Sequence, residues 1–278
     1  MRDLLLYSFI TKQDAYQRMV GFLVLFFFSL SNVHAQGKLW GMTSQGGSDG
    51  IGIIFKTNAD GSGQTVQSEF NVTSPAKGAL PNGSLIQAAN GKLYGTTASG
   101  GAFTFGVLYE YNPASGTFSR LLDFDGPTKG SGPNGSLVLV NGKLYGLTNT
   151  GGANYEGTLF EYDISSSAFI KKIDFGGATN GSNPYGSLCL ASNGKLYGMT
   201  QAGGLNNKGA LFEFDPGTSI FTKKYDFAAS TGKGARGAKV REPAGWAPFI
   251  DPAKSNFFEY VEFERSYSKS TPRSLAPP

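Results

Sequence analysis

The sequence has very little of the chemistry on which most enzyme active sites depend. Its 278 residues include one histidine, His34, and one cysteine, Cys189. Catalysis by a serine or cysteine nucleophile needs a histidine base, and zinc and copper sites draw on clusters of histidine and cysteine. The sequence therefore predicts no catalytic residues, no metal site and no cofactor. A lone cysteine cannot form an internal disulfide, and Cys189 is expected to be buried and inert because it stands at an apolar strand position.

Charge is also scarce, and no segment is strongly basic. Only 16% of the residues are charged, and the formal net charge of +4 is spread along the chain. Nucleic-acid-binding proteins concentrate lysine and arginine on one face, so we expect no nucleic-acid partner. Helical periodicity is missing, whereas 40 glycines and 13% aromatic residues are typical of an all-β protein with short strands and tight turns.

The longest apolar run lies near the N-terminus. Residues 20–31 are apolar or small, follow Arg18, and precede small residues at alternate positions. As a helix this run would span about 18 Å, short of the roughly 30 Å hydrocarbon layer, and the pattern is typical of a secretory signal peptide. We expect residues 1–35 to be removed, together with His34. The mature protein would then be extracellular, on the cell surface or periplasmic, without stable membrane insertion; an uncleaved membrane anchor is the alternative.

A period of about fifty residues runs through the middle of the chain. A Gly-Lys-Leu-aromatic-Gly motif begins at positions spaced 54, 51 and 52 residues apart, namely Gly37, Gly91, Gly142 and Gly194. An Asn-Gly-Ser-Leu or Tyr-Gly-Ser-Leu motif and an acidic-aromatic pair recur with the same period. Self-similarity at one fixed period is the signature of a repeat architecture.

Each period contains four predicted strands. In the second repeat they cover residues 83–88, 92–97, 106–112 and 117–125. The third strand alternates, with Leu108 on one face and Tyr109 and Tyr111 on the other, as a pleated strand requires. A strand that is apolar on both faces belongs to a sheet covered on both sides. The predicted fold is therefore a β-propeller of four-stranded antiparallel blades.

The repeats supply about four blades. The chain after residue 35 begins on a second strand, three full sets follow, and Gly237 to Val240 stand where a further first strand is due. Pairing of this segment beside the N-terminal strands would close a small propeller; the alternative is a truncated part of a larger one, with an exposed sheet edge. Residues 36–241 are thus predicted to form the repeat domain. Residues 242–278, where the repeat landmarks stop, are predicted to be a disordered or aberrant tail.

These motifs resemble a known bacterial repeat. The pattern Leu-Tyr-Gly-x-Thr-x-x-Gly-Gly-x-x-x-x-Gly-x-Leu-Phe-Glu-Tyr-Asp, found at residues 144–163, is similar to the GloVer tandem repeat of exported "choice-of-anchor" proteins. It is also similar to the kelch blade, with its double glycine before an aromatic-acidic strand. The resemblance covers about residues 36–237 and implies a surface location more firmly than an activity. No C-terminal anchor of that family is recognisable here.

Variation between the repeats indicates where a ligand would bind. The loops after the second and fourth strands are long and differ between repeats, and they emerge on one face because the strands alternate in direction. We expect a carbohydrate or a protein to bind there, on an uncharged rim of aromatic and amide side chains that break the repeat. The candidate binding residues are Phe103, Phe105, Asp125, Lys129, Tyr155, Asn206 and Asn207.

The expected function is a non-catalytic binding or scaffold module with a glycan or peptide ligand. Most carboxylates recur at fixed repeat positions, as Glu110, Glu161 and Glu213 do. Residues repeated in every blade normally belong to the architecture, because catalysis happens at one place. The alternative is a polysaccharide-acting enzyme with an Asp/Glu pair, in which Asp125 would face a second acid that does not recur.

Overall fold

A computed structural model describes five parts of the chain, residues 37–71, 77–232, 234, 247–250 and 261–263. The predicted signal peptide, the segment from Gly237 to Val240 and most of the predicted tail lie outside them. Contacts divide the chain into two units: among the described residues, one holds 37–39 and 57–64, and the other holds 40–56 and those from Thr65 onward. Within these described parts, no helix is long and apolar enough to cross a membrane.

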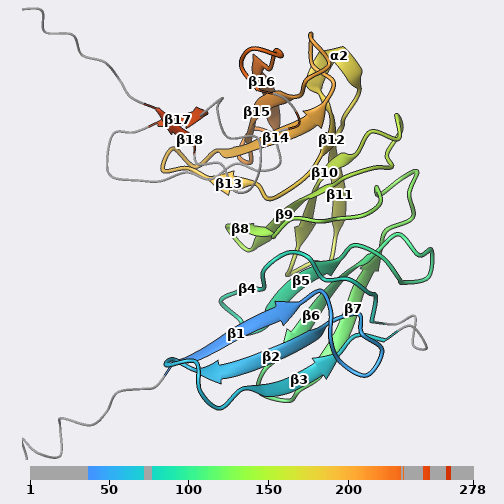
Figure 1. Cartoon of the computed structure of the whole chain (residues 1–278), viewed down its shortest axis with the longest axis vertical. Coiled ribbons are helices and arrows are strands. Elements are labelled where there is room, and N and C mark those ends of the chain that lie inside the picture. Colours follow the sequence, from blue (N-terminus) through green and yellow to red (C-terminus); the bar gives the residue numbers. More distant parts are fainter. Residues whose placement is uncertain (1–36, 72–76, 233, 235–246, 251–260, 264–278) are drawn as a thin grey trace, which may run out of the picture. The chain divides into compact units, whose positions relative to one another are not determined.

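Short strands make up nearly all of the regular structure (Figure 1). The first sheet contains β1 (Lys38–Thr43), β2 (Ile53–Asn58) and β3 (Thr65–Glu69). The second contains β4 (Ile86–Gln87), β5 (Leu93–Thr97), β6 (Val107–Asn112) and β7 (Thr117–Asp123). The third contains β8 (Val138–Val140), β9 (Lys143–Thr148), β10 (Thr158–Asp163) and β11 (Phe169–Asp174).

The fourth sheet has an additional strand. It contains β12 (Ser182–Pro184), β13 (Cys189–Leu190), β14 (Leu196–Ala202), β15 (Ala210–Asp215) and β16 (Ile220–Asp226). The one-turn helix α2 (Gly177–Asn180) precedes β12, and the sequence predicted neither element. Further on, β17 (Ala247–Ile250) and β18 (Val261–Phe263) pair antiparallel with each other.

The predicted all-β fold and its antiparallel sheets are confirmed. The second and third sheets follow the chain, as in the order β4-β5-β6-β7, whereas β12 and β13 of the fourth sheet both pair with β14; the paired strands of these three sheets run antiparallel. The first strand of the second repeat is shorter than predicted, and the N–H of Ser84 donates to the hydroxyl of Ser136, two residues before β8, instead of to β5. The fourth strand ends at Asp123 rather than at residue 125, although Phe124 still donates its N–H to the carbonyl of Gly106, the residue before β6.

The last glycine of the repeated motif makes room for an aromatic ring. Gly146 on β9 lies opposite Phe160 on β10, and a Cβ at Gly146 would lie 2.4 Å from Cζ of that ring. Gly95 and Gly198 stand in the same relation to aromatic rings of β6 and β15. The aromatic residue of the third strand therefore lies across the second strand, which explains why both residues recur together.

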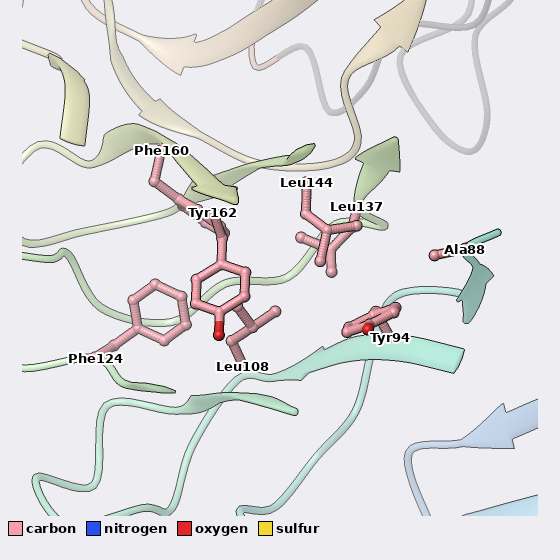
Figure 2. Packing of buried hydrophobic residues seen from close by; sticks show 8 residues of the cluster. All are labelled: Ala88, Tyr94, Leu108, Phe124, Leu137, Leu144, Phe160 and Tyr162. Atoms are coloured by element: carbon pink, nitrogen blue, oxygen red, sulfur yellow. The ribbon is translucent and has the colours of Figure 1, made fainter. Parts of the chain in front are cut away.

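Successive sheets pack face to face. Figure 2 shows Tyr94 and Leu108 of the second sheet with Leu144, Phe160 and Tyr162 of the third. Leu108 and Phe160 are completely buried. The prediction that the third strand of each repeat is covered on both faces is confirmed in the second repeat by adjacent buried residues, Leu108 and Tyr109, that belong to different core clusters.

One aromatic contact recurs at each of these packed faces. The residue that follows the fourth strand lies against the third-strand aromatic of the next sheet. The ring centroids are 5.5 Å apart for Phe70 and Tyr109, 5.3 Å for Phe124 and Phe160, and 5.3 Å for Phe175 and Phe212. Such pairs contribute about 0.5–1.5 kcal/mol each beyond their buried area. The acidic-aromatic motif is therefore a contact between sheets.

The Gly-Ser motifs of successive repeats are joined by bonds from a backbone N–H to a serine hydroxyl. The N–H of Ser84 donates to Oγ of Ser136 at 2.8 Å, and the N–H of Ser136 donates to Oγ of Ser187 at 2.9 Å. The backbones of the second and third of these motifs approach so closely that a Cβ at Gly135 would lie 1.9 Å from the carbonyl oxygen of Gly186. The sequence did not predict this contact, although it explains the recurrence of glycine and serine.

Cys189 is half-buried, so the prediction of a buried cysteine was wrong. It occupies the repeat position of Ile86 and Val138, which are also half-buried, whereas the adjacent Leu188 is only 4% exposed. Alternation along the strand turns Leu188 toward the core and leaves the next residue at the margin.

Candidate functional site

The repeated glutamates are held in the same ion-pair arrangement in three sheets. Glu161 on β10 accepts from Nζ of Lys143 at 2.6 Å and from the hydroxyl of Tyr145 at 3.0 Å, and Nζ of Lys172 lies 2.8 Å away. Glu110 and Glu213 have the corresponding partners Lys92 with Tyr94 and Lys195 with Tyr197. These contacts link the second and third strands in all three sheets, and Lys172 and Lys224 extend them to the fourth strand in the third and fourth sheets, so the glutamates have a structural role.

The charge state of Glu161 follows from these contacts. Burial by itself raises the pKa of its carboxyl, but the bonds from Lys143, Lys172 and Tyr145 outweigh burial and hold the pKa below its ordinary value. Bonds to the charged form stabilise that form. Glu161 is therefore ionised at neutral pH and unsuited to donating a proton.

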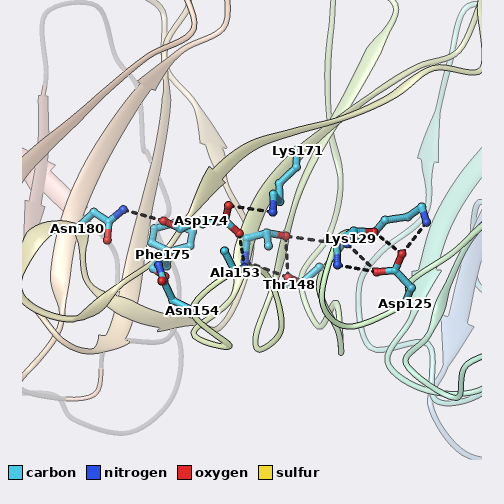
Figure 3. Close-up of polar contacts among 11 residues, drawn as sticks. Asp125, Lys129, Thr148, Ala153, Asn154, Lys171, Asp174, Phe175 and Asn180 are labelled. Atoms are coloured by element: carbon cyan, nitrogen blue, oxygen red, sulfur yellow. Dashed lines mark hydrogen bonds and ion pairs between the residues drawn. The ribbon is translucent and has the colours of Figure 1, made fainter.

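The repeated aspartate at the end of the fourth strand closes the loop that follows the second strand. In the third repeat, Asp174 accepts the N–H of Ala153 at 2.8 Å and pairs with Lys171 at 2.8 Å (Figure 3). The double glycine allows this approach, because Gly152 has a φ of 78° and a Cβ there would lie 2.4 Å from the aspartate oxygen. Asp123 and Asp226 accept in the same way from Ala102 and Leu205.

An asparagine secures the same loop in the third and fourth repeats. Asn154 donates its amide to the carbonyl of Phe175 at 2.9 Å, and Asn206 donates to the carbonyl of Phe227 at 3.1 Å. Asn206 therefore belongs to the repeat, and the expectation that it breaks the repeat was wrong. Asn207 accepts the N–H of Gly203 at 3.0 Å. Asn206 thus ties its loop to the residue that follows β16, and Asn207 bonds to the backbone within its own loop.

The second repeat has Phe103 at the position of that asparagine. A phenyl ring cannot make the amide contact, and Phe103 is 53% exposed instead of being packed. The next residue, Thr104, has a φ of 65°, and Tyr155 and Asn207 also have a positive φ at the same position, but the second repeat places there a β-branched residue, which rarely adopts this conformation. Departures from local rules of this kind are expected where a protein is specialised for function.

The loop after β7 is also closed differently in the second repeat. Asp125 accepts the N–H groups of Thr128 and Lys129 at 2.9 and 2.7 Å, the hydroxyl of Thr128, and the ammonium group of Lys129 at 2.7 Å (Figure 3). In the third repeat Gly176 and Asn180 occupy these two positions, and the N–H of Gly176 donates to Asn180 at 2.7 Å. The loop after the fourth strand is therefore closed by an ion pair in the second repeat and by an uncharged hydrogen bond in the third.

The carboxyl group of Asp125 is a poor proton donor. Burial by itself raises its pKa, but the bonds from Lys129 and Thr128 lower the pKa to about 2. A general acid needs a pKa near the working pH. The part of the chain that the structure describes also contains no cluster of three histidine, cysteine, aspartate or glutamate residues fit to hold a metal ion.

A depression of about 380 Å³ lies at these specialised residues. It is lined by Phe103, Arg120, Leu121, Leu122, Asp123 and Lys129. Its volume is near the lower end of the 300–1,000 Å³ range typical of small-molecule sites. The edge strand β7 supplies four of the six lining residues, and the flanking loops supply the other two.

Five of the six lining residues differ from their counterparts in the next repeat. Phe103, Arg120, Leu121, Leu122 and Lys129 stand where the third repeat has Asn154, Lys171, Lys172, Ile173 and Asn180. Arg120 is the single arginine between residues 37 and 234 of the sequence. Because the surrounding frame is repeated, this concentration of differences at one depression makes it the strongest candidate for a functional site.

Two of the seven predicted residues, Phe103 and Lys129, line this depression. Asp125 is bonded to Lys129, and the carbonyl of Phe105 accepts the N–H of Gly132 in the neighbouring loop at 3.0 Å. Tyr155 lies in the corresponding loop of the third repeat, is 70% exposed and has a φ of 58°. Tyr155, Asn206 and Asn207 do not line the depression.

Sequence reasoning missed four lining residues, Arg120, Leu121, Leu122 and Asp123. Arg120 could have been found, because it interrupts a column that is lysine at Lys171 and Lys223. The rim was also expected to be uncharged, which was wrong. Arg120 and Lys129 place two cations there, each paired with an aspartate at 3.3 and 2.7 Å.

Comparison with known proteins gives one family and several distant structural matches. No curated protein matches the chain. A 6-phosphogluconolactonase proposed in Bacteroides fragilis shares 13% identity, with a TM-score of 0.47 over 74% of this chain and 58% of its own. TolB from Acinetobacter baumannii shares 10% identity, with a TM-score of 0.44 over 71% and 44%.

A third match is the extracellular domain of a proposed one-component system from B. thetaiotaomicron, with 18% identity and a TM-score of 0.44. The match covers 66% of this chain and 21% of that protein, so the chain spans only part of the length of these solved structures. With TM-scores below 0.5, these similarities carry no weight for the function of this chain.

The family comparison is direct and extensive. The model of the Gloeobacter/Verrucomicrobia repeat matches residues 29–248. That range contains the four sheets with their Gly-Lys-Leu-aromatic-Gly motifs, double-glycine loops and acidic-aromatic pairs. The GloVer resemblance seen in the sequence is thereby confirmed, and the chain belongs to the Gloeobacter/Verrucomicrobia repeat family.

Proposed function

We propose that the chain is a non-catalytic binding module, exported or displayed at the cell surface, whose ligand is a glycan or a peptide. The ligand binds at the depression beside Phe103. One observation carries this proposal: the residues that depart from the repeat gather around one depression, with an exposed aromatic ring and two cations. The enzyme alternative has no comparable support, because Asp125 is tied to Lys129 and its pKa is about 2.

The proposed scaffold is a kelch-like β-propeller of four blades. Face-to-face packing of successive four-stranded sheets supports blades, and Gly237 to Val240 would supply the missing first strand beside β1. Phe227 would then pack on the first sheet as Phe70, Phe124 and Phe175 pack on the sheets that follow them.

A protein that ends after Arg236 tests whether the propeller closes. If the ring closes, removing the last strand should lower the unfolding free energy measured in urea. If the array is open, the unfolding free energy should be unchanged.

Phe103→Asn is expected to weaken ligand binding by about tenfold or more, the effect of losing an aromatic anchor. Asparagine is the residue that the third and fourth repeats use here, and its amide can donate to the carbonyl of Phe124 as Asn154 donates to that of Phe175. The variant should therefore fold normally. Glycan and peptide arrays identify the ligand, and titration calorimetry compares the two proteins.

Leu205→Asn provides the matched control. Leu205 is 76% exposed and lies in the corresponding loop of the fourth repeat, so its replacement also removes an exposed apolar side chain, but away from the depression. Its affinity should equal that of the unmodified protein. A Phe103→Asn protein that binds as tightly as the control would contradict the proposed site, and arrays without any ligand would contradict the binding function.

A further inference from the structure

We propose that the fold leaves one Asn-Gly pair, Asn141-Gly142, open to spontaneous conversion into isoaspartate. This modification site is independent of the proposed binding function. In the reaction the backbone nitrogen of the glycine loses its proton to hydroxide and attacks the side-chain carbonyl carbon of the asparagine. A C–N bond forms, the amide group takes up a proton and leaves as ammonia, and water then opens the cyclic imide to isoaspartate or aspartate. The asparagine amide and the glycine N–H must both be free to react.

Five of the six Asn-Gly pairs in the chain have a hydrogen-bonded amide. In the second repeat Asn90 donates its amide to the hydroxyl of Tyr94 at 2.8 Å, and its side-chain oxygen accepts the N–H of Lys92 at 3.0 Å. Asn193 makes the same two bonds in the fourth repeat. The remaining three bonded amides are those of Asn82, Asn134 and Asn180. Asn141 has no side-chain hydrogen bond to any residue that the structure describes.

A shorter loop explains why Asn141 differs from Asn90. Strands β8 and β9 pair as far as Val140 and Lys143, so the loop consists of Asn141 and Gly142 alone, with φ values of 50° and 78°. This is the tight hairpin turn in which Asn-Gly is favoured. In the second and fourth repeats the loop is one residue longer, and its asparagine has no positive φ. The side chain of Asn141 therefore leaves the backbone in a different direction, and the bond to the tyrosine is not made.

The attacking nitrogen is free for the same reason. The N–H of Gly91 donates to the carbonyl of Ala88 at 2.9 Å, and the N–H of Gly194 donates to that of Ala191 at 2.9 Å. Among the described residues, the N–H of Gly142 has no such acceptor. Both reacting groups are therefore unbonded in the third repeat and bonded in the other two.

Exposure and sequence do not separate the three turns. The asparagine and the glycine are exposed in each of them, and a Cβ on any of the three glycines would meet nothing within 4 Å. The six residues Asn-Gly-Lys-Leu-Tyr-Gly are identical in the copies that begin at positions 90, 141 and 193. A difference in reaction rate between the copies therefore reports the hydrogen bonds of the fold.

The test incubates the full chain in a mildly alkaline buffer, in which the glycine N–H loses its proton more readily. Peptide mass spectrometry, with fragmentation that distinguishes isoaspartate from aspartate, follows each pair over time. Asn141 should react about tenfold or more faster than Asn90 and Asn193, because there the hydrogen bonds of both reacting groups must first be broken. In guanidinium chloride, which unfolds the chain, the three copies should react at similar rates.

A second measurement follows the charge of the whole protein. Each conversion replaces a neutral amide by a carboxylate, so a more acidic form should accumulate in the unmodified protein and much more slowly in Asn141→Ser. Equal rates at the three copies in the folded protein would overturn the proposal, as would an acidic form that accumulates equally in Asn141→Ser. A faster reaction at Asn141 that persists in guanidinium chloride would also overturn it, because the fold would then not set the rate.

Discussion

Replacing Gly135 with alanine should destabilise the protein by about 3 kcal/mol, at the upper end of the cost of overpacking. The added Cβ would lie 1.9 Å from the carbonyl oxygen of Gly186 and 2.3 Å from its carbon. Both are backbone atoms, so no side chain can rotate away, and the sheets must separate. That movement would also stretch the bond from the N–H of Ser136 to Ser187.

Alanine at two other glycines gives a comparison for the destabilisation expected at Gly135. At Gly83 the corresponding distance is 2.6 Å, so Gly83→Ala should cost less than Gly135→Ala. At Gly217 the nearest atom is a side-chain oxygen of Asp215 at 3.3 Å, and Gly217→Ala should be nearly neutral. Urea denaturation of the three variants gives their unfolding free energies. Equal stability of all three would show that the Gly-Ser contact between sheets does not exist.

Replacing Glu161 with alanine should also cost about 3 kcal/mol, because breaking a buried ion pair from one side leaves the opposite charges uncompensated. The glutamate side chain is 2% exposed and is bonded to Lys143, Lys172 and Tyr145. Glu110, its counterpart in the second repeat, is 15% exposed and has one lysine partner. Glu110→Ala should therefore cost clearly less.

The pH dependence provides a second measurement on the same residue. The pKa of Glu161 in the folded protein lies below its ordinary value of 4.5. Its contribution is therefore fully present above about pH 4.5 and is lost as the pH falls through the folded pKa. Unfolding free energies of the unmodified protein and of Glu161→Ala should converge in that acidic range. A difference that stays constant would mean that the ion pairs do not stabilise the fold.

The repeat frame could be predicted from the sequence because its signals are local and periodic. Alternation at Leu108 and Tyr109 indicated a strand buried on both faces, and both are fully buried. Asn90-Gly91 marked the turn between the first two strands of the second repeat, where the structure places it. Such features depend on neighbouring residues and on the two-residue period of a strand, which the sequence displays directly.

The contacts between repeats could not be predicted in the same way. The bond between Ser84 and Ser136 joins residues one full repeat apart, and nothing local distinguishes it from a turn. The depression was found only in part for the same reason: Phe103 and Lys129 lie in loops, where variation is visible, whereas Arg120 sits in a regular strand. Comparing each residue with its column would have revealed Arg120, because the next two repeats place lysine there.

A titration followed by nuclear magnetic resonance tests the central claim most directly, namely that the second repeat is a specialised binding site on a repeated frame. The isotope-labelled protein is titrated with the ligand that the arrays identify, and amide shifts are compared between Phe103, Arg120 and Lys129 and their counterparts Asn154, Lys171 and Asn180. The account predicts shifts concentrated at the first three positions. Equal shifts in both repeats, or shifts confined to another part of the chain, would contradict it.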